Sequence, residues 1–287
     1  MYPGGKGSVY QKLINLIPPH STYIETHVGG GSVMRAKRPA RLNIGIDLDI
    51  AALEEMDRIV PGCIVVNGDA LPGYIAKIDV PGAPPNMAMT AAIAKISDGA
   101  VPSNMAMSAD TIKSSDVITS LKTAMLPAFR YVLMDAIAFL KEFPLDTSCF
   151  IYCDPPYLFE TRSSKRPIYK FEYSEADHVR LLECLLSLPC NVMVSGYWSN
   201  LYAETLHDWH TFTFKAKTRS GRMADEWLWM NYPEPVKLHD YQYLGGDFRE
   251  RERIKRRKTR WGKRLERMDV LERRAILWEM QERGLIE

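Results

Sequence analysis

The chain has 287 residues, 46% of them hydrophobic and 25% charged, which is enough to bury a sizeable core in one or two globular domains. Its 37 Lys and Arg residues and 35 Asp and Glu residues leave a net charge of +2, so the chain as a whole is not a polycation. No apolar run approaches a membrane span, and the N-terminus does not resemble a signal peptide, so we expect no membrane partner. Five cysteines without paired CxxC spacing predict reduced, packed thiols in a cytoplasm.

Short strands alternate with helices in the N-terminal part of the sequence. Residues 1–18 predict a glycine-rich loop and a short amphipathic helix, and residues 21–34 predict a strand, an acid at its end, a second glycine loop and a helix. Residues 42–50 and 62–71 predict two further strands, each of which ends in an aspartate. This alternation is typical of βαβ units and predicts a parallel sheet.

The composition changes over residues 77–120, where aromatic residues almost disappear. This stretch contains the near-repeat PPNMAMTAAIAKISD and VPSNMAMSADTIKSSD, which is rich in small residues, Met and isolated prolines. Such a composition predicts a low-complexity surface insertion, mobile or partly helical, without chemistry of its own.

Strand and helix patterns return after the insertion. Residues 129–143 predict a strand and a helix, and residues 191–206 predict another strand, a turn and a helix. Residues 209–221 and 225–232 predict a closing antiparallel pair that is rich in aromatic and β-branched residues. Beyond Pro235 the sequence becomes a long, charge-rich helical pattern, followed by a second amphipathic helix.

The sequence FIYCDPPYLF, residues 150–159, places an acid, two prolines and a tyrosine directly after a run of β-forming residues. In an open α/β sheet, ligands bind outside the carboxyl ends of the strands, where we expect Asp154 to lie. Pro155 and Pro156 stiffen the turn, so the Asp154 carboxylate and the Pro155 carbonyl can both accept hydrogen bonds from one amino group. Tyr157 offers a flat face for a planar ring. The motif therefore indicates a site for the amino group of a nucleobase, and the alternative is a tight turn capped by Asp.

A glycine loop and an acid point to a nucleoside ligand. The segment ETHVGGG follows a predicted strand and opens a helix, so its backbone amides can approach a ligand closely. On its own it fits a nucleotide loop, a cofactor loop or a plain tight turn equally well. Asp47 ends the next strand, where a carboxylate typically accepts hydrogen bonds from ribose hydroxyls. Because GxxxxGK[ST] is missing, we expect a nucleoside that carries no triphosphate.

Three motifs in this order resemble those of Dam-type (D12 class) DNA adenine-N6 methyltransferases. YPGGKG, residues 2–7, resembles the family's N-terminal aromatic-x-GGK loop, and YIETHVGGGSV, residues 23–33, resembles its E-P-F-x-G-x-G loop. DPPY, residues 154–157, is the family's catalytic motif. The resemblance covers residues 1–69 and 129–235.

The resemblance implies an α/β fold, the Rossmann-like fold of S-adenosylmethionine-dependent methyltransferases. Its catalytic domain is expected over residues 1–76 and 121–235. The insertion at 77–120 then takes the target-recognition position, so sequence specificity is reduced or supplied elsewhere. Residues 236–287 form a basic helical C-terminal extension.

The family's site residues carry over to matching positions. Those implied to hold the cofactor S-adenosylmethionine are Tyr2 and Lys6 in the N-terminal loop, Glu25 and Gly29 to Gly31 at its methionine end, and Asp47 at its ribose. Those implied to be catalytic are Asp154, Pro155, Pro156 and Tyr157. The chain departs from the family where Tyr2 replaces a tryptophan and where Thr26 and His27 replace Pro-Phe, which loosens the second loop.

Two acids compete for the contact with the adenine of the cofactor. Asp69 in NGDAL and Asp135 in LMDAI both end strands, and the insertion separates them. We favour Asp69, because its strand is the third in chain order, and keep Asp135 as the alternative. Residues 195–200, SGYWSN, also end a strand on this side and fit either the pocket of the target base or a tight turn.

The implied reaction is transfer of a methyl group to the N6 amino group of adenine in double-stranded DNA. The target atom is inaccessible inside a duplex, so the base must be flipped out and stacked on Tyr157. No metal is required. The resemblance also implies a bacterial or phage-infected cytoplasm and allows a partner restriction nuclease. The oligomeric state and the recognised DNA sequence cannot be read from the sequence.

The C-terminal extension carries a run of basic residues that can bind DNA phosphates through Coulomb attraction and counterion release. Its core, KRRKTRWGKR, contains no acid, and the alternative is a solvated helix. The predicted nucleic-acid-binding residues are Arg251, Arg253, Lys255, Arg256, Arg257, Lys258 and Arg260.

Two other functions remain open from the sequence. The first is an RNA or protein amide methyltransferase, because D/NPPY loops serve those substrates too, and the N-terminal GGK loop argues against it. The second is a non-catalytic DNA-binding relative that has kept the fold, and the intact DPPY argues against that.

Overall fold

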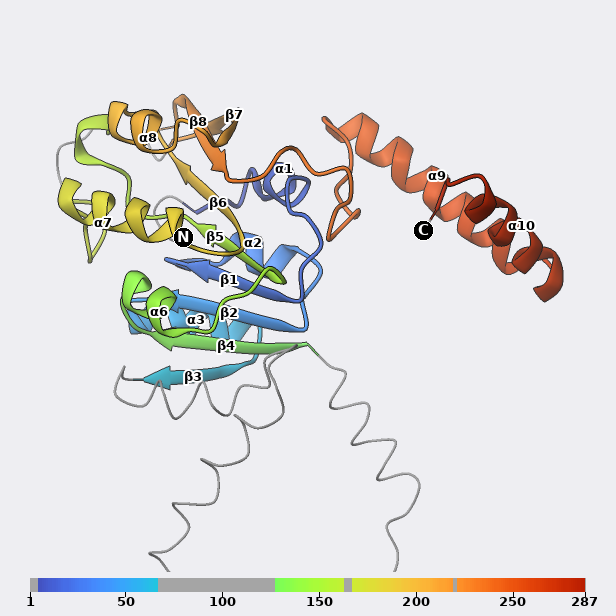
Figure 1. Cartoon of the computed structure of the whole chain (residues 1–287), viewed down its shortest axis with the longest axis horizontal. Coiled ribbons are helices and arrows are strands. Elements are labelled where there is room, and N and C mark those ends of the chain that lie inside the picture. Colours follow the sequence, from blue (N-terminus) through green and yellow to red (C-terminus); the bar gives the residue numbers. More distant parts are fainter. Residues whose placement is uncertain (1–4, 67–126, 163–166, 219–220, 287) are drawn as a thin grey trace, which may run out of the picture. The chain divides into compact units, whose positions relative to one another are not determined.

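The computed structural model describes residues 5–66, 127–162, 167–218 and 221–286 (Figure 1). The chain divides after His239 into a sheet unit and a helical unit. The sequence places this boundary four residues earlier, after residue 235 (239 − 235 = 4). The predicted insertion, residues 77–120, lies outside the described residues.

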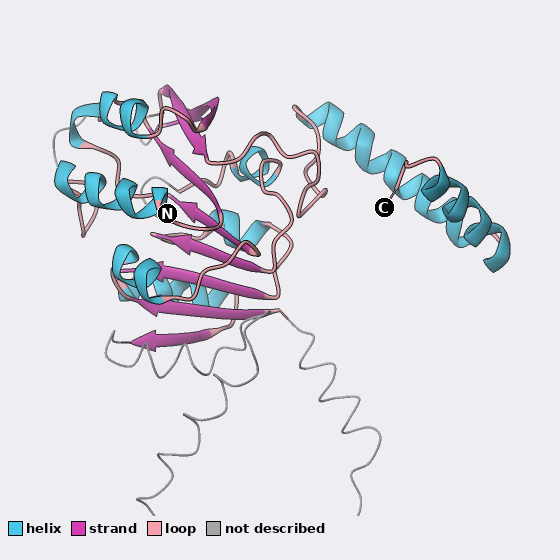
Figure 2. Ribbon diagram, viewed as in Figure 1, coloured by secondary structure: helices cyan, strands magenta, loops and turns pink. Residues whose placement is uncertain are grey.

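The sheet unit contains one mixed sheet whose described strands follow the order β3-β4-β2-β1-β5-β6-β8-β7 (Figure 2). β8 runs antiparallel to both of its neighbours, and every other pairing is parallel. Every strand predicted from the sequence is present. The bounds are β1 Thr22–Thr26, β2 Leu42–Asp47, β3 Cys63–Val66, β4 Ala128–Leu133, β5 Cys149–Cys153, β6 Asn191–Gly196, β7 His210–Lys217 and β8 Met223–Met230.

The choice of Asp69 depended on β3 being the third strand in chain order, and the sheet does not follow chain order. β3 is third in chain order, but it lies at the edge of the sheet and pairs only with β4 among the described strands. β4 lies beside β2 instead, in register from Leu42 with Ala128 to Asp47 with Leu133. β4, the first described strand after the insertion, therefore lies next to β2, which in turn lies next to β1.

Helices begin where short polar side chains cap them. Asp49 caps α3, Asp135 caps α6, and Ser174 with Asp177 forms a capping box at the start of α7. α6 packs against α7, and α7 packs against α8. The helices of the sheet unit are α1 Tyr10–Ile14, α2 Ser32–Ala36, α3 Ile50–Ile59, α6 Ala136–Glu142, α7 Glu175–Leu186 and α8 Asn200–Thr205.

The helical unit contains α9, Phe248–Glu266, and α10, Val270–Glu282, as the charge-rich pattern predicts. Asp247 caps α9 and Asp269 caps α10. Neither helix has a buried residue. In the described part of the chain, no helix is long and apolar enough to cross a membrane.

The parallel strands bring several acids to one edge of the sheet. β1, β2 and β5 are buried along their whole length, as expected for parallel strands covered on both faces. Thr26 lies opposite Ile46 on one side and opposite Cys153 on the other. The residues that end or follow these strands therefore meet at the carboxyl edge, where open α/β sheets bind ligands.

Candidate active site

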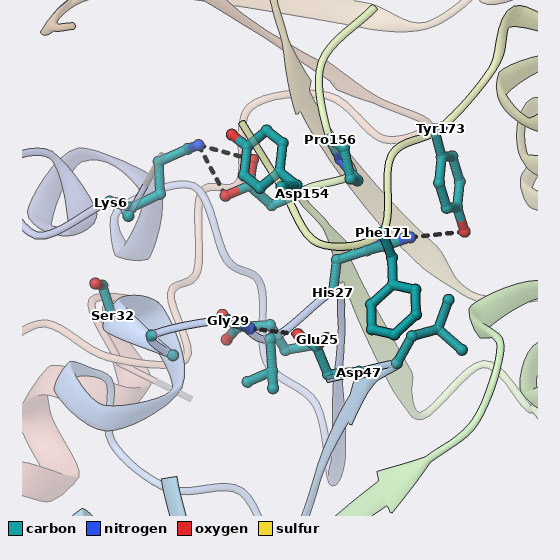
Figure 3. A pocket seen from close by; sticks show the side chains of 16 residues that line it. Lys6, Glu25, His27, Gly29, Ser32, Asp47, Asp154, Pro156, Phe171 and Tyr173 are labelled. Carbon is teal, nitrogen blue, oxygen red and sulfur yellow. Dashed lines mark hydrogen bonds and ion pairs between the residues drawn. The ribbon is translucent and has the colours of Figure 1, made fainter. Parts of the chain in front are cut away.

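A pocket opens at the carboxyl edge of β1, β2 and β5 (Figure 3). It brings together residues from the N-terminal loop, the glycine loop, the end of β2, the DPPY motif and the segment before α7. The lining residues are Gly5, Lys6, Glu25, His27, Val28, Gly29, Gly30, Gly31, Ser32, Asp47, Leu48, Asp154, Pro156, Tyr169, Phe171 and Tyr173. Lys6, Glu25, Gly29, Gly31, Asp47, Asp154 and Pro156 were predicted from the sequence.

The glycine loop between β1 and α2 takes a backbone path that side chains resist. Gly29 and Gly31 have φ values of 46° and 54°, in the left-handed region. His27, with φ 58°, adopts the same region although it is not glycine. A Cβ atom on Gly31 would lie 2.2 Å from Met56 Sδ, so the loop passes directly over α3. The tight path lets backbone amides line the pocket.

Glu25 is a buried carboxylate at the end of β1. Its Oε2 accepts hydrogen bonds from the Tyr23 hydroxyl at 2.8 Å and from the Met34 amide at 3.0 Å. Burial raises the pKa of Glu25 to about 8, against the opposing effect of the hydrogen bond from Tyr23. Both of these hydrogen bonds end on Oε2, which leaves Oε1 for a ligand in the pocket.

Asp47 at the end of β2 holds the glycine loop in place. Its Oδ2 accepts a hydrogen bond from the Gly29 amide at 2.8 Å, and its Oδ1 accepts one from the Asp49 amide at 2.9 Å. Burial raises the pKa of Asp47 above its ordinary value. Asp47 therefore lines the pocket and also fixes the loop that forms its wall.

Lys6 and Asp154 form an ion pair at the carboxyl end of β5. The Lys6 ammonium donates to both Asp154 oxygens, at 2.7 and 2.8 Å, and to the Tyr157 hydroxyl at 2.6 Å. The Ser195 hydroxyl from β6 donates to Asp154 Oδ1 at 2.7 Å. Burial on its own lowers the pKa of Lys6, but the charges of Asp154, Tyr152 and Glu226 together with the hydrogen bond to Asp154 outweigh it, and the pKa rises above its ordinary value. The sequence did not indicate this pairing of the N-terminal loop with the DPPY motif.

Tyr157 is covered in this structure, which differs from the open platform expected from the sequence. Its exposed fraction is 7%, its ring meets Tyr197 edge-on at 4.7 Å, and the Lys6 ammonium lies 5.0 Å from the ring centroid. Burial raises the pKa of its hydroxyl well above the usual value. A base can stack on Tyr157 only after side chains around it move.

Several site residues escaped the sequence reasoning. Glu226 on β8 lies 3.7 Å from the Lys6 ammonium, and the pocket wall includes Tyr169, Phe171 and Tyr173. The His27 ring shares a hydrogen bond of 2.8 Å with the Tyr173 hydroxyl, and burial lowers the pKa of His27 to about 4. The signal for the aromatic wall was the alternation in IYKFEY, whereas nothing local marks Glu226.

The acid expected at the cofactor's adenine is not placed in the pocket. Tyr2 and Asp69 lie outside the described residues, so both remain predictions. Asp135, the alternative, accepts a hydrogen bond from the Ala138 amide at 2.9 Å and caps α6. It does not line the pocket. Pro155, predicted to be catalytic, is buried beside the pocket-lining Pro156.

Most basic residues of α9 and its C-terminal end belong to one of two groups. Arg251, Arg253 and Lys258 make contacts inside the helical unit, with the Gly245 carbonyl at 3.4 Å, the Glu250 carboxylate at 3.0 Å and the Tyr241 carbonyl at 3.0 Å. The second group lines a concave surface together with Glu252 and Thr259. We call this group the basic surface, and it consists of Lys255, Arg256, Arg260, Lys263, Arg264 and Arg267. Arg257 is exposed outside it.

The middle of the chain matches a known family. Residues 135–223 match the family model described as D12 class N6 adenine-specific DNA methyltransferase. This match confirms the resemblance for a segment that contains DPPY and Ser195, whereas Lys6, Glu25 and Asp47 lie outside it. No curated protein matches the chain.

Solved structures share the general arrangement only loosely. A conserved hypothetical protein from Streptococcus pyogenes aligns with a TM-score of 0.40 at 9% identity, covering 82% of this chain and 100% of its own. TrmK from M. capricolum, in complex with S-adenosyl-homocysteine, aligns at 0.36 and 9% identity over 96% of both chains. An rRNA methylase from Streptococcus thermophilus aligns at 0.35 and 6% identity, covering 77% of this chain and 92% of its own. At TM-scores this low, these likenesses carry no argument about function.

Replacing Gly31 by Ala tests the path of the glycine loop. The new Cβ meets Met56 at 2.2 Å and the backbone is left-handed, so we expect Gly31→Ala to lower the free energy of unfolding by roughly 1–3 kcal/mol. Gly7→Ala is the matched control, because the nearest atom to its Cβ is Ser32 Oγ at 4.0 Å. Urea denaturation measures both variants, and equal stabilities would contradict the close approach.

The raised pKa of Glu25 predicts a pH dependence of stability. The folded protein holds this proton more tightly than the unfolded chain, so the contribution is present below about pH 4.5 and is lost as pH rises through about 8. Glu25→Gln mimics the protonated side chain. We expect the free energy of unfolding of the variant to match that of the parent protein near pH 4.5. Above that pH the variant should become the more stable of the two, by up to ~1.4 kcal/mol per pH unit.

Denaturant titrations at several pH values check this expectation. Glu54→Gln, on the exposed surface of α3, is the control for loss of one carboxylate. If the stability difference between Glu25→Gln and the parent protein does not change with pH, Glu25 is not a protonated buried acid.

Proposed function

We propose that this protein transfers a methyl group from S-adenosylmethionine to the N6 amino group of adenine in DNA. One observation carries the proposal: the Asp154 carboxylate of a DPPY motif lies at the carboxyl end of β5, in the wall of the pocket that the glycine loop encloses. The match to the D12 family model includes this motif. The choice of adenine in DNA rests on the description of that family.

The residues present in the pocket fit the proposed cofactor. S-adenosylmethionine carries an ammonium, a sulfonium, a ribose diol and a planar base, and when bound it supplies an electrophilic methyl group. Glu25 and Asp47 line the pocket and offer acceptors for the ammonium and the hydroxyls. Tyr169 and Phe171 offer aromatic faces for the base.

Asp154 is suited to activate an aromatic amine. The lone pair of the adenine amino group is delocalised into the ring, which makes the amine a poor nucleophile. A hydrogen bond from that amine to Asp154 localises the lone pair on nitrogen. Bound S-adenosylmethionine would supply the methyl group, and Asp154 would orient the amine that takes it up and loses one proton to solvent. Positioning and electrostatics supply most of the rate enhancement in such a transfer.

The basic surface is suited to the phosphates of the proposed DNA substrate. Its six cations include only one with an ion pair in the described residues, Lys255 with Glu252 at 3.9 Å. Arg251, Arg253 and Lys258, which the sequence analysis included among the DNA contacts, already make contacts within the unit. The proposed phosphate contacts therefore shift toward the C-terminal half of α9. Counterion release from DNA favours binding to such a surface.

Substitution of Asp154 tests the proposed reaction. Asp154→Ala removes the acceptor of the target amine, so we expect methylation to fall by on the order of 10²-fold or more. Binding of S-adenosylhomocysteine, measured by calorimetry, is expected to stay within a modest factor. The assay uses labelled S-adenosylmethionine with adenine-containing duplex DNA, with RNA of the same sequence and with protein.

The outcomes of this assay separate the candidate substrates. Asp208→Ala, at an exposed aspartate after α8, is the control and should retain full activity. Full activity of Asp154→Ala would refute the role of the motif. Label transferred only to RNA or protein would refute the DNA substrate and leave the chemistry in place.

Two triple variants with equal charge change test the basic surface. Arg256→Gln, Arg260→Gln and Lys263→Gln together should weaken DNA binding and reduce the slope of log K against log salt by up to ~2.7, since each phosphate contact contributes about 0.9. The control combines Arg251→Gln, Arg253→Gln and Lys258→Gln, whose cations already have partners in the unit. Equal changes in slope would show that only net charge matters.

A further inference from the structure

The carboxylate that the proposed reaction needs is already occupied. Both Asp154 oxygens accept hydrogen bonds from the Lys6 ammonium (Figure 3). Oδ1 also accepts one from the Ser195 hydroxyl. Lys6 thus sits in the position of an amine bound to Asp154. A target amino group can take this place only if the ammonium moves away from Asp154.

The movement of the buried Lys6 ammonium is limited by its need for a counter-charge. The exposed fraction of Lys6 is 3%, and a buried charge that loses its counter-charge is strongly destabilised. Displacement by a neutral amine would leave Lys6 without an ionic partner unless another carboxylate lies within reach. The exchange is therefore feasible only beside a second buried acid.

Glu226 supplies that second acid. Its Oε2 lies 3.7 Å from the Lys6 ammonium, which is within ion-pair distance but longer than a hydrogen bond. The same oxygen is buried and accepts no hydrogen bond from the described residues. Burial raises the pKa of Glu226, and the nearby charge of Lys6 opposes that rise. A short movement of Lys6 would convert this long contact into a hydrogen-bonded ion pair.

The arrangement of the three groups gives the movement a direction. Lys6 and Asp154 line the pocket, whereas Glu226 does not, because it lies on β8 beyond the lysine. Transfer of the ammonium toward Glu226 therefore withdraws it from the position that the amine must take. The Tyr157 hydroxyl, 2.6 Å from Lys6, lies in the same cluster as Glu226.

We infer that Glu226 is a positioning residue that receives the Lys6 ammonium when the target amine binds Asp154. The inference rests on the proposed function for the identity of the amine. The exchange itself depends only on the three charges: one cation lies between two carboxylates and can pair with either. Glu226 acts through Lys6 and need not touch substrate or cofactor.

The activity test uses single and double variants at saturating cofactor. Glu226→Gln should slow methyl transfer by on the order of 10²-fold, because the ammonium then stays on Asp154. Lys6→Met removes the ammonium, so Glu226→Gln should cause no further loss in that background. Glu226→Asp should restore part of the rate. Asp225→Asn, at the exposed neighbour that pairs with Lys215, is the control. Equal loss from Glu226→Gln in both backgrounds, or no loss in either, would overturn the inference.

A stability test keeps the inference apart from the proposed function. In Asp154→Ala protein, Glu226 becomes the remaining acid for Lys6, so Glu226→Gln should lower the denaturation midpoint more in that background than in the parent protein. Additive effects of the two substitutions would overturn the exchange. Coupled stabilities in a protein that methylates none of the substrates would refute the proposed function and support the exchange.

Discussion

The buried ion pair between Lys6 and Asp154 is the contact on which the organisation of the site depends. It joins the N-terminal loop to the end of β5 across 148 positions of the chain. Each partner needs the other, because burial without a counter-charge strongly destabilises either ion. The loop is therefore held over the pocket by the same carboxylate that the proposed chemistry uses. The Lys6 ammonium and a target amine therefore compete for the Asp154 carboxylate.

The other acids of the site are brought near this ion pair by the parallel strands. Parallel strands deliver their carboxyl ends to one edge, and there Glu25 and Asp47 end β1 and β2 while Asp154 follows β5. Burial raises the pKa of Glu25 and Asp47, and the charges of Asp154 and Asp49 add to these rises, so the pocket disfavours further negative charge. A positively charged ligand relieves this condition, which agrees with a cofactor that carries an ammonium and a sulfonium.

Local sequence signals predicted the strands and the acids that follow them. The alternation of strands and helices and the glycine loop predict that Glu25, Asp47 and Asp154 lie together. These features depend on neighbours in sequence. The rule that open α/β sheets bind ligands at the carboxyl ends of their strands then places the acids at one site. The helix starts at Asp247 and Asp269 also have a local cause, because each aspartate side chain caps the turn that follows it.

The remaining features depend on pairings that no local pattern encodes. β3 follows β2 in chain order, but β4 lies beside β2 in the sheet, because strand order depends on packing of segments far apart in sequence. Lys6 seemed to serve the cofactor alone, and its contact with Asp154 spans half the chain. Glu226 lies near Lys6 because β8 inserts between β6 and β7 in the sheet. Asp135, the alternative to Asp69 for the cofactor contact, accepts a hydrogen bond from the Ala138 amide, and its role toward a cofactor stays a prediction.

The distribution of charge also explains why a protein with a net charge of only +2 can suit the proposed DNA substrate. A pocket rich in carboxylates repels phosphates, and Lys6 is held inside it by two acids. Attraction for the DNA backbone must then come from a surface where cations are not neutralised by nearby acids. Arg256, Arg260 and Lys263 meet this condition on α9. Because salt screens exposed charges beyond about 10 Å, such a surface acts on the phosphates that it touches, while the acids of the pocket keep their preference for a cationic ligand.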